Sequence, residues 1–301
     1  MLQFGRYKEG WELFEWRFYG TGAAVGARVF RQPPWDGQGF HGQMLLVHAE
    51  QGLGDTIQSY RFVPMARQLG GVTVEVPRPL ARLFASQPNA PLVVPRGDPP
   101  PRFDLQCPMM TLPLVLGIEL HSLPGAPYLV ADPALGAAWR AKLPPLGDQM
   151  RVGIAWAGNP EHPNDRNRSV SLSVMLDMAG TGAMVVSLQQ TVPDADQQTL
   201  REASHVIDPR AGLTDFAETA ALIDQLDLVI AVDTSVAHLA GAMGKPVWIL
   251  LPANADWRWL LERDDSPWYP SARLFRQDKP GDWAGVAARV RDALKEWPRR
   301  A

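Results

Sequence analysis

The feature of this sequence that most constrains its fold is an alternation of strand-like and helix-like segments, which runs through the chain twice. The apolar run at 43–49 leads into a helical pattern at 56–69, and a second strand-like run follows at 72–77. A new series with the same rhythm begins at 151–158. Alternation of this kind predicts parallel sheets covered by helices on both faces. The sequence therefore predicts an α/β fold of two doubly wound, Rossmann-like domains that face each other across a cleft.

The predicted domain boundaries follow from where each alternating series begins and ends. Between the two series, the prolines of 142–148 indicate a hinge. Ahead of the first series, the aromatic residues of 5–18 recur every three to four positions, which predicts a helix. The predicted segments are an N-terminal helical segment at 1–34, a first Rossmann-like domain at 35–145, a second at 146–280, and a C-terminal helix at 281–301.

The bulk properties of the chain exclude several classes of protein. A formal net charge of −3 gives no general attraction to nucleic acid, so no nucleic-acid partner is expected. The single cysteine, Cys107, excludes an internal disulfide and a metal site built from several cysteines. No stretch approaches the ~20 apolar residues that span a bilayer, so we expect no integral membrane segment. Because a signal-peptide pattern is also missing, we expect a cytoplasmic protein, with peripheral attachment at the inner membrane left open.

The strongest functional signal is a compact strand–helix–strand unit at 226–251, in which the first strand ends at Asp233. Thr234 and Ser235 then place two hydroxyls at the start of a helix, where backbone amides have no intrahelical partner. Such a helix start suits a phosphate group, because the helix dipole is positive there. His238, about one turn into the helix, faces the same pocket in this interpretation. The alternative is an ordinary capped helix with a packed histidine.

A second unusual segment is the loop Gly-Leu-Gly-Asp at 52–55, placed where a strand turns into a helix. Glycine loops at such positions often bind phosphate. This loop, however, has no lysine, and the negative charge of Asp55 would repel a phosphate group. Its residues alone indicate that Asp55 caps the helix that follows.

Other polar residues follow the strands of the second series, at the edge where doubly wound sheets bind ligands. Gln189 follows the run at 183–188 and either contacts a nucleoside or belongs to a capping loop. Asp215 either reaches the same site or stabilises the start of its own helix. Asp256 follows the last strand-like run of the second domain and is expected to line the cleft.

Several of these stretches resemble a known family. The run AVDTSVAHLAGAMGKPVWIL at 231–250 is similar to the nucleotide-sugar diphosphate motif of glycosyltransferase family 9, the heptosyltransferase-like enzymes. The loop EQGLGDTIQ at 50–58 is similar to the N-terminal Gly-Asp loop of that family. Residues 38–297 also resemble the catalytic region of bacterial tetratricopeptide-repeat glycosyltransferases, in stretches such as NDRNRS and DWRWLLERDDSPWYP. The N-terminal residues resemble the end of one such repeat.

The resemblance implies a GT-B fold, with the donor held mainly by 146–280 and the acceptor approached from 35–145. It also implies an inverting reaction that needs no metal or other cofactor. Asp55 would then accept the proton of the attacking hydroxyl. The residues implied to hold the donor diphosphate are Thr234, Ser235, Val236, His238, Arg168 and Arg166, since arginine suits phosphate oxygens. Those implied to contact the nucleoside or sugar are Gln189, Asp233, Asp215 and Asp256. The acceptor-side loop would consist of Gly52, Leu53 and Gly54, whose glycines allow a sharp turn and leave space for sugar atoms.

The function that we expect is transfer of a sugar from a nucleotide-diphosphate sugar to a hydroxyl of a glycan, a lipopolysaccharide or a protein. Glu50 is the rival to Asp55 as the base. Two alternatives stay open, namely a GT-B nucleotide-sugar epimerase and a catalytically inactive nucleotide-binding or scaffold protein. The expected partners are thus the nucleotide-sugar donor and a glycan or protein acceptor, and the sequence identifies neither the base, the sugar nor the acceptor.

Overall fold

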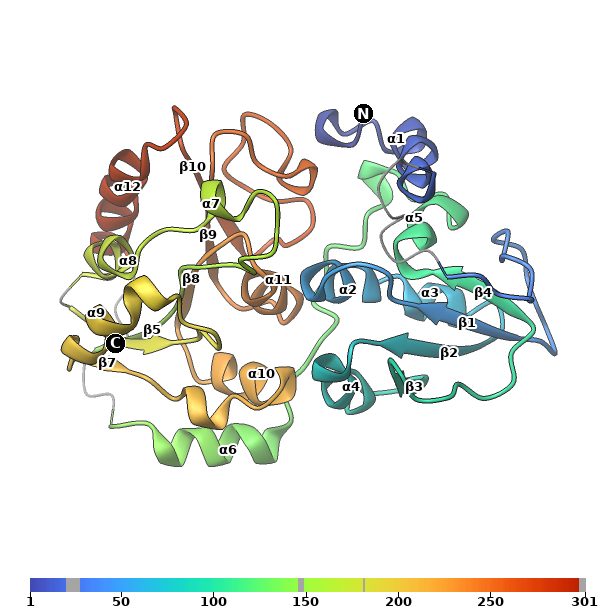
Figure 1. Cartoon of the computed structure of the whole chain (residues 1–301), viewed down its shortest axis with the longest axis horizontal. Helices are drawn as coiled ribbons and strands as arrows, with labels where there is room; N and C mark the ends of the chain where they lie inside the picture. The colour runs from blue at the N-terminus through green and yellow to red at the C-terminus, as the bar shows by residue number, and fades with distance from the viewer. Residues whose placement is uncertain (20–27, 146–148, 181, 298–301) are drawn as a thin grey trace.

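The computed structural model describes residues 1–19, 28–145, 149–180 and 182–297, which form two lobes (Figure 1). Within this part of the chain, the N-terminal half holds a four-stranded sheet in the order β3-β2-β1-β4, with every neighbouring pair parallel. Its strands are β1 (Met44–His48), β2 (Gly71–Val76), β3 (Leu92–Pro95) and β4 (Leu105–Pro108). Its helices are α2 (Leu53–Tyr60), α3 (Val63–Arg67), α4 (Arg78–Ala85) and α5 (Leu112–Val115).

The C-terminal half holds a six-stranded parallel sheet in the order β10-β9-β8-β5-β6-β7. Its strands are β5 (Met150–Ala155), β6 (Ala183–Ser187), β7 (Val206–Ile207), β8 (Leu228–Val232), β9 (Val247–Leu251) and β10 (Ala272–Arg276). Its helices are α6 (Pro133–Lys142), α7 (Asp165–Arg168), α8 (Leu172–Ala179), α9 (Gln197–Glu202), α10 (Phe216–Asp224), α11 (Ser235–Ala242) and α12 (Trp283–Lys295).

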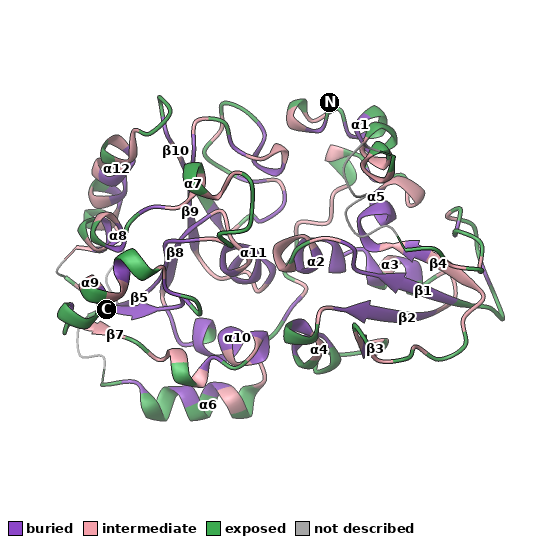
Figure 2. Ribbon diagram, viewed as in Figure 1, coloured by how far each residue is buried: buried purple, intermediate pink, exposed green. Residues whose placement is uncertain are grey.

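The apolar runs of the sequence become strands that are covered on both faces. Every residue of β8 and β9 is buried, as expected when helices cover both sides of a parallel sheet. Figure 2 shows buried strands inside both lobes and exposed residues on the outward faces of the surrounding helices. The prediction of two doubly wound parallel sheets is therefore confirmed.

Some local predictions differ from the structure. The helix predicted at 56–69 is divided into α2 and α3, because Pro64 in the first turn of α3 has no amide to extend the hydrogen bonds of α2. Asp215 caps α10 by accepting hydrogen bonds from two amides of its first turn, which is the second of its two predicted roles. The helices α6 and α7 and the strand β10 lie where no element was predicted. The predicted hinge ends in 146–148, which lie outside the described residues.

The two halves meet through two pairs of helices. In the centre of Figure 1, α2 packs against α11, and below them α4 packs against α10. Arg82 of α4 pairs with Asp215 and with Glu218 of α10, each at 2.7 Å. Arg61, directly after α2, is buried and donates a hydrogen bond to the backbone carbonyl of Trp268 at 2.8 Å. Specific contacts therefore set how the two sheets face each other.

The N-terminal segment contacts both halves. It consists of the short helices η1 (Leu2–Phe4), α1 (Tyr7–Phe14) and η2 (Glu15–Phe18), so the helix predicted at 5–18 is present in two pieces. The indole of Trp11 donates a hydrogen bond to the carbonyl of Ile118 in the N-terminal half at 2.9 Å. Its ring centroid lies 5.4 Å from that of Trp257 in the C-terminal half. The assignment of the N-terminal segment to a tetratricopeptide repeat stays a prediction. Residues 20–27 lie outside the described residues.

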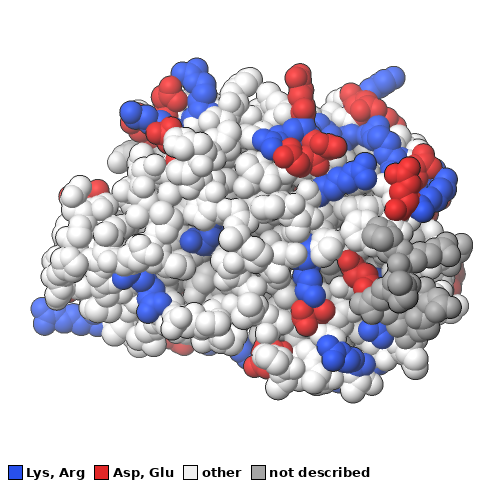
Figure 3. Space-filling model, turned by 180° about the vertical axis from the view of Figure 1, so that it is seen from behind, with Lys and Arg blue, Asp and Glu red and all other residues white. Residues whose placement is uncertain are grey.

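Charged side chains of both signs lie next to one another on the face shown in Figure 3, and much of that face carries no charge. Among the described residues, no helix has both the length and the apolar character needed to cross a bilayer.

The aromatic contacts of the N-terminal segment predict that it contributes to global stability. Trp11 is 3% exposed, whereas Trp16 on the same segment is 68% exposed. We expect Trp11→Ala to lower the free energy of unfolding by about 3–5 kcal/mol, as for other buried aromatic truncations. The matched control Trp16→Ala should change it by less than about 0.5 kcal/mol. Urea unfolding followed by fluorescence measures both, and equal effects would show that the segment does not pack as described.

Candidate functional site

A cavity of about 820 Å³ lies between the two halves. Its wall in the C-terminal half is formed by residues that follow β5, β6, β8 and β9, at the carboxyl ends of these strands, which is where doubly wound sheets bind ligands. The N-terminal half contributes residues 52–55 at the start of α2. All predicted site residues except Arg166 and Asp215 line this cavity.

The start of α11 has hydrogen-bonding groups that the protein does not use. Thr234 is the N-cap residue, but its hydroxyl caps none of the helix amides. Its Oγ1 is buried and has no hydrogen-bond partner among the described residues. A buried hydroxyl without a partner is costly, and the first amides of a helix also lack intrahelical partners. Together with Ser235 and Val236, Thr234 therefore offers unoccupied donors to an anionic group in the cavity.

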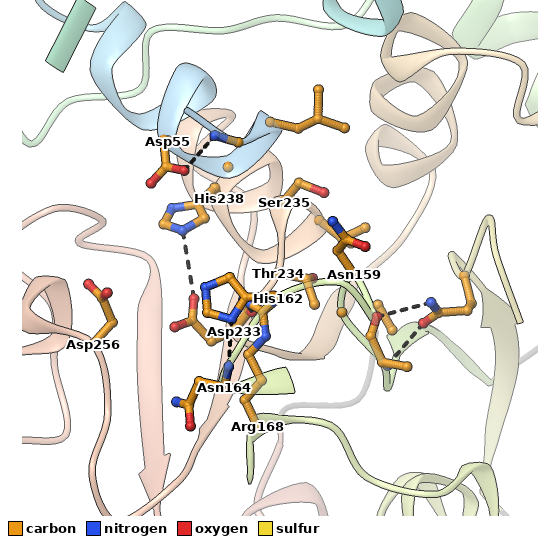
Figure 4. A pocket seen from close by; sticks show the side chains of 18 of the residues that line it. Asp55, Asn159, His162, Asn164, Arg168, Asp233, Thr234, Ser235, His238 and Asp256 are labelled. Carbon is orange, nitrogen blue, oxygen red and sulfur yellow. Dashed lines mark hydrogen bonds and ion pairs between the residues drawn. The ribbon is translucent and has the colours of Figure 1, made fainter. Parts of the chain in front are cut away.

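Asp55 lies in the first turn of α2, and both of its carboxylate oxygens have partners. Oδ2 accepts a hydrogen bond from the amide of Gly52 at 2.8 Å, so Asp55 caps the start of its own helix. Oδ1 pairs with the guanidinium of Arg258 in the other half. Figure 4 shows the carboxylate on the far side of His238 from Asp233, at the edge of the cavity. The helix cap is therefore present, and the position is compatible with a chemical role as well.

Arg258 is the residue of this site that the sequence pattern did not reveal. It is 7% exposed and pairs with Asp256 at 2.7 Å as well as with Asp55. Although burial favours the neutral guanidine, the charges of Asp256 and Asp55 raise the pKa of Arg258 above its usual value. The signal for it in the sequence was its place between Trp257 and Trp259, because an arginine among apolar side chains needs polar or charged partners.

His238 and Asp233 lie together behind the start of α11. Nδ1 of His238 is 2.8 Å from the hydroxyl of Tyr269, and Nε2 is 3.7 Å from the carboxylate of Asp233. Burial lowers the pKa of His238 well below its usual value, so its ring is neutral near neutral pH. Burial, followed by the charge of Asp256, raises the pKa of Asp233 to about 6. The cavity thus contains an acid that is easily protonated beside a neutral imidazole.

Gly54 has a packing role that differs from the one predicted. The backbone of Gly52 is ordinary, with φ −71° and ψ 176°, and neither Gly52 nor Gly54 has a positive φ, so their conformation does not itself require glycine. A Cβ atom added to Gly54 would lie 2.8 Å from Cδ2 of His238. The absence of a side chain therefore leaves space for His238, and it allows α2 to approach α11 closely.

The loop after β5 brings one of its two predicted arginines to the cavity. Arg168 donates a hydrogen bond to the backbone carbonyl of Asp233 at 3.0 Å and pairs with Asp165 at 3.2 Å. Arg166 is exposed and does not line the cavity. His162 is exposed at the cavity wall, where its Nδ1 accepts a hydrogen bond from the amide of Asn164 at 3.1 Å.

The residues predicted to contact a nucleoside have structural partners. The amide group of Gln189 accepts from the backbone of Trp156 and Ala157 and donates to the carbonyls of Ala157 and Thr191, so it holds two loops together. Asp256 caps the short helix η7 (Trp257–Trp259) and lines the cavity. Asp215 lies outside the cavity lining and pairs with Arg82.

Glu50, the rival base, does not line the cavity. It pairs with Arg17 at 3.1 Å and accepts a hydrogen bond from the amide of Met110 at 3.2 Å. Burial raises the pKa of Glu50 above its usual value. Among the described residues, no three His, Cys, Asp or Glu side chains are grouped so that they could hold a metal ion.

Comparison with known sequences relates this site to a family of sugar-transferring enzymes. Residues 185–260 match the profile of the family described as glycosyltransferase family 9 (heptosyltransferase). This segment contains the start of α11 and Arg258. The chain is also 29% identical over 327 residues to Protein FlbA of Caulobacter vibrioides, across 99% of this chain and 54% of the relative. The chain therefore spans about half the length of that relative.

Solved structures of glycosyltransferases share the fold at low sequence identity. A family 9 glycosyl transferase from Veillonella parvula superposes with a TM-score of 0.59 at 11% identity, over 86% of this chain and 90% of that one. The ADP-heptose lipopolysaccharide heptosyltransferase II of E. coli superposes with a TM-score of 0.57 at 14% identity, over 84% of this chain and 98% of that one. The iron-containing heptosyltransferase TibC of enterotoxigenic E. coli was solved with ADP-D-β-D-heptose. It superposes with a TM-score of 0.57 at 12% identity, over 86% of this chain and 76% of that one. The fold is GT-B.

The raised pKa of Asp233 predicts a pH dependence of stability. Its pKa is about 6 in the folded protein against an ordinary 3.8, so ionisation of Asp233 disfavours the folded state. The contribution of protonated Asp233 to the free energy of unfolding is therefore fully present below the ordinary pKa and is lost as the pH rises through about 6. Relative to Asp233→Asn, the wild-type chain should lose up to about 3 kcal/mol of unfolding free energy between about pH 4 and pH 7.

Urea unfolding of both proteins across this pH range tests the prediction. The control is Asp177→Asn, which changes an acid whose side chain is 62% exposed and should leave the pH dependence nearly unchanged. A constant difference between wild type and Asp233→Asn at every pH would contradict the prediction.

Proposed function

We propose that this chain is an inverting glycosyltransferase that moves a sugar from a nucleotide-diphosphate sugar to a hydroxyl of a glycan, a lipopolysaccharide or a protein. The observation that carries the proposal is the pairing of two features in one cavity. An unfilled helix start, at Thr234 and Ser235, suits a diphosphate. A carboxylate from the opposite half, Asp55, stands on the same cavity and suits a base.

In this proposal the diphosphate of the donor lies at the start of α11. The amides of its first turn and the hydroxyls of Thr234 and Ser235 donate hydrogen bonds to phosphate oxygens. Arg168, whose guanidinium is already directed to the end of β8, adds positive charge at the same place. His238 contributes a neutral imidazole and no charge. The proposal therefore needs no metal ion to bind the donor.

The reaction would use Asp55 as general base. The acceptor oxygen attacks the anomeric carbon while its proton passes to a carboxylate oxygen of Asp55. The bond from the anomeric carbon to the diphosphate oxygen breaks, and the diphosphate leaves with the electron pair. Charge that develops on the leaving group is then stabilised by the fixed dipoles of the helix start and by Arg168. Inversion would result if the base directs the acceptor to the face of the sugar opposite the leaving group.

The chemistry of the solved relatives suggests which donor to test first. The E. coli relative is an ADP-heptose lipopolysaccharide heptosyltransferase, and TibC was solved with ADP-D-β-D-heptose. We therefore propose an ADP-linked sugar as the first candidate, with UDP, GDP and CDP compounds for comparison. We also propose that the acceptor is reached from the cytoplasmic side.

A binding experiment with paired arginine variants tests the donor site. Any nucleoside diphosphate that binds only the folded state must raise the melting temperature. We expect Arg168→Gln to weaken the affinity for the preferred nucleoside diphosphate by about 10-fold or more, as for loss of a charge-assisted hydrogen bond. Arg166→Gln, in the same loop but away from the cavity, should bind as wild type. Calorimetry measures both affinities.

Two results would oppose this assignment. If none of the four nucleoside diphosphates shifts the melting temperature, the inactive scaffold alternative gains support. If the two arginine variants lose equal affinity, the loop acts through general charge and not through a diphosphate contact.

The role of Asp55 predicts a selective loss of turnover. Asp55→Asn keeps the shape of the side chain but removes the proton acceptor, so transfer should fall by about 100-fold or more. Binding of the nucleoside diphosphate should be retained, because the carboxylate is not part of the proposed diphosphate site. Single-turnover transfer and calorimetry on the same preparation measure the two effects, and turnover near the wild-type rate would remove Asp55 from the mechanism.

A further inference from the structure

We propose that Arg258 is a positioning residue, which holds the carboxylate of Asp55 in its reactive orientation from across the cleft. The inference rests on the proposed function of this site as a glycosyltransferase. It adds a residue from the donor half that acts on the base without contacting the reacting atoms itself.

The carboxylate of Asp55 is held from both halves of the molecule. The amide of Gly52 fixes Oδ2 from within its own loop at 2.8 Å. The guanidinium of Arg258 holds Oδ1 from a position 203 residues away in the sequence. With one partner on each oxygen, rotation of the carboxylate is restrained, and each oxygen keeps a lone pair for an incoming hydroxyl. The base is therefore oriented only when the two halves are together.

Arg258 is itself rigidly placed. Besides Asp55, it pairs with Asp256 at 2.7 Å and donates to the side-chain oxygen of Gln58. Its guanidinium lies 4.5 Å from the ring centroid of Trp257. That ring packs in turn against Trp11 of the N-terminal segment at 5.4 Å between centroids. A side chain with this many fixed partners can impose its position on Asp55 with little loss of entropy.

A second buried arginine shows that the pair with Asp55 is not needed simply to join the halves. Arg61 also crosses between them, and it is 3% exposed. Its described hydrogen-bond partners are oxygens without charge, such as the carbonyl of Trp268 and the hydroxyl of Tyr128. Both arginines lose water on burial, but Arg61 joins the halves through neutral oxygens alone, so joining them does not require a carboxylate partner. Arg258 and Asp55 line the cavity, whereas Arg61 and its hydrogen-bond partners do not, which points to a functional role for the first pair.

Turnover and donor affinity, measured separately, test the inference. The probe reaction is release of ADP from ADP-heptose, with water as the acceptor if no other is known. We expect Arg258→Met to lower kcat by about 100-fold, since misplacement of a catalytic group by about 1 Å has an effect of that size. The affinity for ADP should change little. Arg258→Lys keeps the positive charge but loses the planar set of N–H donors of the guanidinium, so it should recover part of kcat.

Arg61→Met is the matched control. It removes a buried arginine from the same interface without touching Asp55, so it should lower the melting temperature while leaving kcat of the folded protein nearly unchanged. If Arg258→Met and Arg61→Met lower kcat equally, Arg258 serves only to join the halves and the inference fails. Loss of ADP affinity in Arg258→Met would also overturn it, because that result assigns the residue to donor binding.

A double-mutant cycle separates this inference from the proposed function. The melting temperatures of Asp55→Asn, Arg258→Met and the double variant report whether the two side chains are coupled in solution. If the wild-type chain releases no ADP and transfers no sugar, the proposed function fails. Additive effects in the cycle show, independently of any activity, that Arg258 does not hold Asp55.

Discussion

The contact between α2 and α11 is the constraint on which the site depends. Each helix begins at the carboxyl end of a strand, one in each sheet, and the two starts must lie close together for a single cavity to include both. Gly54 makes this approach feasible because it leaves space for the ring of His238. The ion pair of Asp55 with Arg258 then joins the same two regions at the cavity edge. A side chain at Gly54 would separate the proposed base from the proposed diphosphate site.

The charged arginine side chains around the cavity are paired with carboxylates. Arg168 is paired with Asp165, and Arg258 with two aspartates. Within the described part of the chain, the buried hydroxyl of Thr234 has no protein partner, and its side chain leaves the first amides of α11 uncapped. An anionic ligand would therefore be recognised mainly by oriented dipoles, which need no reorganisation when charge develops.

Much of the fold and part of the site could be predicted from the sequence. The alternation of apolar strands and helices predicted both sheets. Residues that follow the strands were expected at one edge, and Thr234, Ser235 and Asp55 do line one cavity. What could not be predicted depends on contacts between the halves. The partner of Asp55 is Arg258, 203 residues away in the sequence, and a local sequence pattern cannot reveal a partner at that separation. Likewise, Asp215 looked like a site residue until the structure placed Arg82 beside it.

The N-terminal segment changes what opening of the cleft means for this protein. Trp11 packs against both halves, so a wide separation would expose an aromatic ring. The ring would lose its contacts with Trp257 and Trp268, and the apolar area shared with them favours the closed arrangement. The N-terminal segment therefore favours a preassembled cleft. Trp11 adds to the helix contacts that keep the two halves together.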